Sequence, residues 1–135
     1  MTKNQFRVVV ITVLAVTLFG MFIDLLWPNE ITKQITAYAE QLEPEWSDTK
    51  FGLFMVWAFV AIICWVGSVI GLLLFKNWGR LLLLLGFIII IPIYVPMGTA
   101  VSSPLSQIFY DLGSYGEGAI LALCYFSPIA KYFEK

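Results

Sequence analysis

The sequence predicts an all-α integral membrane protein, a four-helix bundle with both termini inside the cell and short amphipathic helices on the outer side. Its 135 residues are 60% hydrophobic and only 13% charged, which is more apolar surface than a soluble domain of this size can bury. Its few charges separate long apolar runs, and a helix needs about 20 such residues to cross a bilayer. We therefore expect one membrane domain over residues 1–135.

Four membrane spans are expected from the positions of the charged residues. The first three apolar runs are long enough to cross without further argument. The uncharged stretch between Glu117 and Lys131 is too short to cross, so a fourth span has to begin near Leu112 and include Glu117. The expected spans are about 8–27, 51–75, 81–99 and 112–131.

The orientation of these spans follows from the basic residues, which stay in the cytoplasm when they lie near span ends. With four spans and a cytoplasmic N-terminus, most basic residues are cytoplasmic and only Lys33 and Lys50 lie outside. The cytoplasmic ones are Lys3, Arg7, Lys76, Arg80, Lys131 and Lys135. An arrangement with three spans would place Lys131 and Lys135 outside, so both termini are predicted to be cytoplasmic.

The first span also fits the charged and apolar regions of a signal peptide. The small-residue sequence Ala37-Tyr38-Ala39 has the form of a cleavage site, but it lies too far beyond Trp27 for an ordinary cleavage region. We therefore expect the first span to remain uncleaved.

The segment FKNWGR, residues 75–80, is predicted to be the cytoplasmic tip of a helical hairpin. Lys76 and Arg80 can extend to the membrane surface, Trp78 suits the interface, and Asn77 and Gly79 allow a tight turn. Together with the preceding leucine, this string resembles the LF-x-x-W-(A/G)-R turn of uncharacterised small bacterial inner-membrane proteins. The resemblance covers only the turn. It implies a bacterial inner-membrane location and no particular activity.

Two segments are expected on the outer side of the membrane. In the first, about 29–43, Asn29 can cap an amphipathic helix that either rests on the membrane boundary or covers the outer end of the bundle. Its apolar stripe is Ile31, Ile35, Tyr38 and Leu42. The second segment, about 100–112, has a helix start at Ser103-Pro104 and is either a separate helix or an extension of the fourth span. Both segments could dock a partner or seal the bundle.

Small residues indicate where helices approach each other, because close packing drives helix association in lipid. Gly67 and Gly71 form a G-x-x-x-G in the second span. Ser114, Gly118 and Ala122 repeat every four residues in the fourth span. These two stripes are expected to face helical neighbours, either each other or a second copy of the chain.

Pro92 and Pro96 share one face of the third span. Each proline removes a backbone donor, so the carbonyls of Ile88 and Pro92 lose their helical partners. Transporters use such breaks to expose carbonyl oxygens to ions, although a kink that fits the helix to its neighbours is the simpler interpretation.

The acidic residues of the spans give one candidate site. Asp24, Asp111 and Glu117 all lie toward the outer side, and a carboxylate at membrane depth is costly unless it is neutralised, paired or hydrated. With Tyr115 they could line a polar pocket that is open to the outside. The alternative is that they are interfacial carboxylates near helix starts, favoured by the helix dipole.

The composition argues against most chemistry. The chain has no histidine, and its two cysteines lie far apart inside apolar runs, so no metal, cofactor or catalytic residue is predicted. Its near-neutral charge gives no reason to expect nucleic acid. The sequence favours a non-enzymatic inner-membrane protein that binds another membrane protein or itself, as accessory subunits and immunity-type proteins do. The alternative is a small oligomeric transporter or channel that uses Glu117 and the Pro92/Pro96 break.

Overall fold

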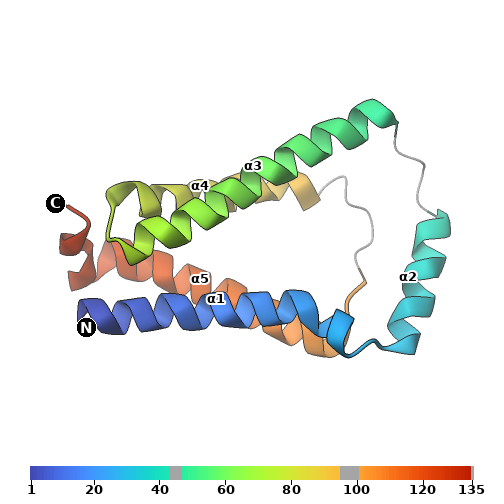
Figure 1. The fold of residues 1–135 in the computed structure, drawn as a ribbon, viewed down its shortest axis with the longest axis horizontal. Helices are drawn as coiled ribbons and strands as arrows, with labels where there is room; N and C mark the ends of the chain where they lie inside the picture. The colour runs from blue at the N-terminus through green and yellow to red at the C-terminus, as the bar shows by residue number, and fades with distance from the viewer. Residues whose placement is uncertain (43–46, 95–100, 135) are drawn as a thin grey trace. The chain divides into compact units, whose positions relative to one another are not determined.

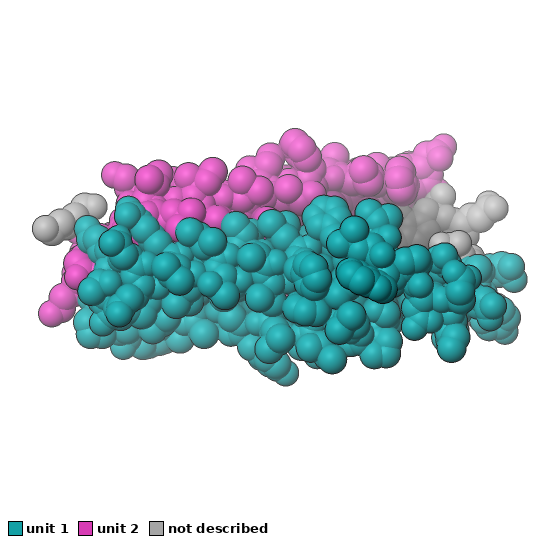
Figure 2. Space-filling model, turned by 60° about the horizontal axis from the view of Figure 1, so that its bottom comes forward, with its two compact units in different colours: residues 1–42, 99–129 teal, residues 43–98, 130–135 magenta. Residues whose placement is uncertain are grey.

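The computed structural model describes residues 1–42, 47–94 and 101–134, and all regular secondary structure within these ranges is helical. The helices are α1 (Lys3–Leu26), α2 (Glu30–Leu42), α3 (Asp48–Leu73), α4 (Asn77–Tyr94), α5 (Pro104–Phe126) and the 3-10 helix η1 (Pro128–Tyr132) (Figure 1). They form two compact units, coloured in Figure 2. Unit 1 comprises Met1–Leu42 and Thr99–Ile129, and unit 2 comprises Glu43–Gly98 and Ala130–Lys135.

Two of the described helices, α1 and α3, are long and apolar enough to cross a membrane. They contain 24 and 26 residues, and at about 1.5 Å per residue each exceeds a hydrocarbon core of about 30 Å. Both expose large apolar side chains along their length, for example Phe22, Leu53 and Phe59. Exposed apolar surface on this scale indicates membrane association.

Unit 1 is built on the antiparallel pair α1 and α5 (Figure 1). Glycines of α5 allow the two backbones to come close. A Cβ atom on Gly113 would lie 2.6 Å from Oγ1 of Thr17, and one on Gly116 would lie 2.6 Å from Cγ2 of Val13. Because Gly113 serves this contact and does not end the helix, α5 runs unbroken from Pro104 to Phe126. The segment that follows Ser103 is therefore part of α5 and not a separate helix.

Unit 2 is built on the hairpin of α3 and α4, whose closest approach is between two glycines. A Cβ atom on Gly71 would overlap the Cα atom of Gly79, and one on Gly67 would lie 2.9 Å from Cδ1 of Leu82. The G-x-x-x-G of the second span therefore faces α4. Gly79 belongs to the first turns of α4 and is needed for this approach, whereas the sequence had assigned it to the tight turn.

The turn between α3 and α4 is made by Phe75, which has a positive φ of 55°. The N–H of Lys76 donates to the carbonyl of Gly71 at 2.8 Å, and the N–H of Phe75 donates to the carbonyl of Leu72 at 3.1 Å. This is the Schellman arrangement, in which glycine is the usual residue at the left-handed position. A side chain there costs about 1–2 kcal/mol, so the tertiary contacts of Phe75 have to offset that cost.

Those contacts come from the C-terminal segment of unit 2. The ring of Phe133 lies 5.4 Å from the ring of Phe75, and the ring of Tyr132 lies 5.8 Å from it. The guanidinium carbon of Arg80 lies 5.9 Å from the centre of the Phe133 ring. Phe75 and Phe133 are both buried, so the strained turn is enclosed by aromatic packing.

Replacing Phe133 by leucine should lower the stability of the protein by about 1 kcal/mol, because the aromatic contacts with Phe75 and Arg80 are lost while most of the apolar volume remains. Thermal unfolding in mild detergent, followed by circular dichroism, measures this change. The matched control is Phe126→Leu, since Phe126 is 91% exposed and the exchange there should be nearly neutral. Equal effects at both positions would contradict the aromatic contribution.

Candidate functional site

A polar network joins the end of α1 to the start of α5. Asp24, in the last turn of α1, accepts two hydrogen bonds from Ser103, one from the hydroxyl to Oδ1 and one from the N–H to Oδ2 at 3.3 Å. Ser103 is only 6% exposed. Its hydroxyl oxygen also accepts from the N–H of Ser106 at 3.2 Å, so one side chain caps α5 and binds the carboxylate of α1.

The network continues one turn into both helices. The hydroxyl of Ser106 donates to the carbonyl of Gly20 at 3.2 Å, and Ser106 is 1% exposed. Both buried serines therefore have hydrogen-bond partners within the protein, as buried polar groups require. The helix start at Ser103-Pro104 was recognisable from the sequence, but the roles of Ser103 and Ser106 in binding α1 were not. The available signal in the sequence was the group of serines around Pro104, namely Ser102, Ser103 and Ser106.

A shallow polar cleft of about 320 Å³ lies beside this network, between the end of α1 and α2. It is lined by Asp24, Pro28, Asn29, Thr32, Lys33, Thr36, Ala37 and Val101. No group of three or more residues that could hold a metal ion occurs in the described part of the chain. The cleft therefore offers hydrogen-bonding groups together with one acidic residue, Asp24, and one basic residue, Lys33. Within the described residues it offers no metal site.

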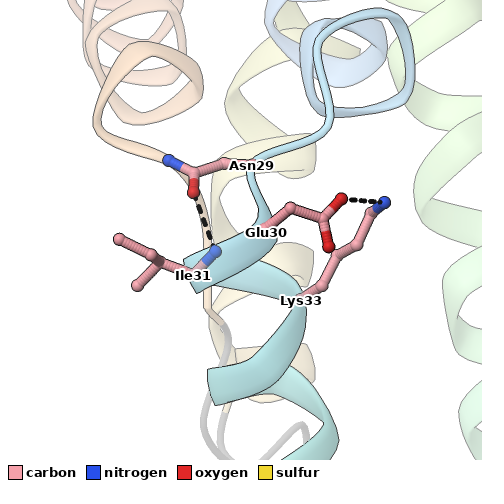
Figure 3. A network of polar contacts seen from close by, with 4 residues as sticks. All are labelled: Asn29, Glu30, Ile31 and Lys33. Carbon is pink, nitrogen blue, oxygen red and sulfur yellow. Dashed lines mark hydrogen bonds and ion pairs between the residues drawn. The ribbon is translucent and has the colours of Figure 1, made fainter.

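The first two turns of α2 line one side of the cleft, and Figure 3 shows the polar contacts at the start of this helix. The side-chain oxygen of Asn29 accepts from the N–H of Ile31 at 3.0 Å, so Asn29 begins the helix as its sequence position suggests. Lys33 pairs with Glu30 at 2.9 Å. Both side chains of this ion pair are exposed, so it adds less than about 1 kcal/mol to stability.

The four residues of the predicted polar pocket do not share this cleft. Asp24 lines it, whereas the other three residues do not. Asp111 is exposed and accepts from the side-chain amide of Gln107 at 2.9 Å. Tyr115 is 74% exposed, and Glu117 is half-buried on α5. Asp24 thus bonds to Ser103 and lines a cleft with residues of α2, and the other three acidic or aromatic candidates lie elsewhere on α5.

The small-residue stripe of α5 lies on a different face from the one that contacts α1. Ser114, Gly118 and Ala122 are exposed, and a Cβ atom on Gly118 would meet nothing within 4 Å. The contact with α1 uses Gly113 and Gly116. Close approach to α1 therefore leaves the regular stripe uncovered.

The residues predicted as topology anchors differ in exposure. Lys76 and Trp78 are exposed and Arg80 is half-buried. The Nε–H of Arg80 donates to the side-chain oxygen of Asn77 at 2.6 Å. This hydrogen bond holds the guanidinium at the first turn of α4.

The proline region of α4 is supported by a neighbouring helix. Pro92 lies inside α4 and cannot donate to the carbonyl of Ile88. In the same turn, the indole N–H of Trp57 on α3 donates to the carbonyl of Ile89 at 2.9 Å. The acceptor is the carbonyl of Ile89 and not that of Ile88, so this hydrogen bond joins α3 to the turn that contains Pro92 without replacing the donor that the proline removes. Pro96 lies outside the described residues.

No family model, curated protein or solved structure matches this chain.

Proposed function

We propose that the chain is a multi-pass protein of the bacterial inner membrane, spanning it with α1, α3, α4 and α5 and keeping both termini in the cytoplasm. The length of α1 and α3 supports this proposal directly. The 18 residues of α4 and the 23 residues of α5 would extend about 27 and 35 Å. The distribution of Lys and Arg favours the orientation.

The polar residues of α5 are compatible with a span because several already have partners. Ser106 donates to the carbonyl of Gly20, and Asp111 accepts from Gln107. Ser103 and Asp24 satisfy each other at the boundary. Polar groups in lipid are tolerated when they are paired in this way.

Within this membrane arrangement, we propose that the protein has no catalytic activity and acts by binding another membrane protein, in the manner of an accessory subunit or an immunity-type protein. The observation that carries the proposal is the exposed stripe of Ser114, Gly118 and Ala122. Small residues let membrane helices approach closely, and the contact with α1 uses a different face of α5. The stripe therefore suits a transmembrane helix of a partner.

Native purification tests this proposal. The chain carries a cytoplasmic C-terminal tag, is extracted in mild detergent, and the co-purifying proteins are identified with their stoichiometry. We expect a stoichiometric foreign membrane protein, which is lost with Gly118→Ile because the larger side chain holds the partner helix away. The control is Ala119→Ile, since Ala119 is also exposed on α5 but lies off the stripe.

Three results would count against the proposal. One is a partner that remains bound to Gly118→Ile as well as to Ala119→Ile, and another is no foreign partner at all. A clean homo-oligomer whose proton flux is abolished by Glu117→Gln would instead establish the transporter alternative. Equal melting temperatures for the two isoleucine variants exclude misfolding as the reason for a lost partner.

A further inference from the structure

The amphipathic helix α2 turns its polar side toward its own unit. Four of its residues line the cleft beside Asp24, namely Thr32, Lys33, Thr36 and Ala37. Its apolar residues are strongly exposed, with Ile31 at 68%, Ile35 at 49% and Tyr38 at 64%. A helix that covered its own bundle would bury the apolar side. The structure therefore disfavours a sealing role for α2.

The two sides follow from helical spacing. Residues 31, 35 and 38 recur at i, i+4 and i+7 and share one face, whereas residues 32, 33, 36 and 37 fall on the opposite face. The helix is continuous from Glu30 to Leu42, and the side-chain oxygen of Asn29 caps its start (Figure 3). The exposed apolar stripe is thus a property of a regular helix.

The chain connections place α2 at the membrane boundary. α1 ends at Leu26 and α3 begins at Asp48. If both helices span the membrane, the chain leaves the membrane at the end of α1 and re-enters it at the start of α3 on the same side, so α2 lies on that side. Its 13 residues extend about 20 Å, which suits a helix that runs along that surface. The exposed residues Leu25, Leu26 and Trp27 end three positions before α2 begins at Glu30, so the apolar surface of α1 lies close in sequence to the stripe of α2.

We propose that α2 lies in the outer membrane–water interface, with Ile31, Ile35 and Tyr38 inserted among the lipids and the polar cleft turned to the head groups and water. This inference rests on the membrane spans of the proposed function. Amphipathic helices bind such interfaces through buried apolar area, and anionic lipids add attraction where the helix is basic. α2 contains Glu30, Lys33 and Glu40 and is not basic, so its insertion depends on its apolar stripe and not on anionic lipid.

Lipid photolabelling of the wild-type chain tests the proposal. The protein is reconstituted into phosphatidylcholine vesicles that contain a phospholipid with a photoactivatable diazirine near the top of its acyl chain. Mass spectrometry then locates the adducts. We expect labelling of Ile31, Ile35 and Tyr38 to exceed labelling of Lys33 and Ala37 several-fold. The same pattern is expected when phosphatidylglycerol is added to the vesicles.

The labelling of α1 and α3 separates the two proposals. Adducts in α1 and α3 without adducts on the stripe of α2 would overturn the inference and leave the membrane spans intact. Absence of adducts from all three helices would overturn the spans as well. Stripe labelling that appears only with phosphatidylglycerol would also contradict an insertion driven by apolar area.

A matched pair of variants sharpens the assignment. Ile35→Asp places a charge in the stripe and should reduce labelling of Ile31 and Tyr38 several-fold. Ala37→Asp places the same charge on the cleft side and should leave their labelling unchanged. Equal labelling in the two variants would contradict an insertion that depends on the apolar character of the stripe.

Discussion

Replacing Gly71 by alanine is expected to lower the stability of the protein by about 3 kcal/mol, because overpacking at a close contact forces the backbone to move. A Cβ atom at this position would overlap the backbone of Gly79, and no rotation of a side chain can relieve that overlap. The α3–α4 hairpin would have to open. Thermal unfolding in mild detergent should therefore show a markedly lower melting temperature.

Gly86 on α4 provides the control for this experiment. A Cβ atom there would meet nothing within 4 Å. Gly86→Ala should be neutral or raise stability by up to about 1 kcal/mol, because alanine favours the helix over glycine. Equal melting temperatures for Gly71→Ala and Gly86→Ala would contradict the close contact between α3 and α4.

Replacing Asp24 by alanine should also be strongly destabilising, by about 3 kcal/mol, because two hydrogen bonds to a charged acceptor are lost and a buried serine is left without its partner. The appropriate control is Asp111→Ala. Asp111 is exposed and accepts one hydrogen bond within its own helix, so its loss should cost less than about 0.5 kcal/mol. Melting temperatures of the two variants compare these effects directly.

A double-mutant cycle attributes the effect of Asp24 to its partner. Ser103→Ala alone should remove both the hydroxyl contact and the cap of α5, and the cap accounts for about 1 kcal/mol. The double variant Asp24→Ala/Ser103→Ala should lose clearly less stability than the sum of the losses of the two single variants. Additive losses would show that the two residues stabilise the protein independently.

The helix starts of this chain could be predicted from sequence because capping is local. Asn29 and Ser103 lie next to the helices that they begin, so their roles depend on a few adjacent residues. The presence of apolar helices followed from composition in the same way. Whether the segment about 100–112 is a separate helix remained open in the sequence, because the continuity of α5 depends on packing against another helix, where Gly113 lies close to Thr17.

The candidate site was harder to predict because its contacts join distant parts of the chain. Asp24 was singled out for its charge, but its partner Ser103 is 79 residues away, and no spacing rule connects them. The turn at Phe75 was missed for a related reason. A positive φ at phenylalanine depends on packing by Tyr132 and Phe133, whereas local preference pointed to Asn77 and Gly79.

The strained turn at Phe75 has a consequence for biosynthesis. Residues 132 and 133 are translated well after α3 and α4, so the hairpin emerges from the ribosome with its left-handed phenylalanine still lacking the aromatic contacts that enclose it. The turn reaches its final stability only when the segment that follows α5 has been made and has packed against it. A chain shortened before residue 128 would keep the strain and lose the contacts, which makes this turn a point at which membrane quality control could distinguish truncated from longer chains.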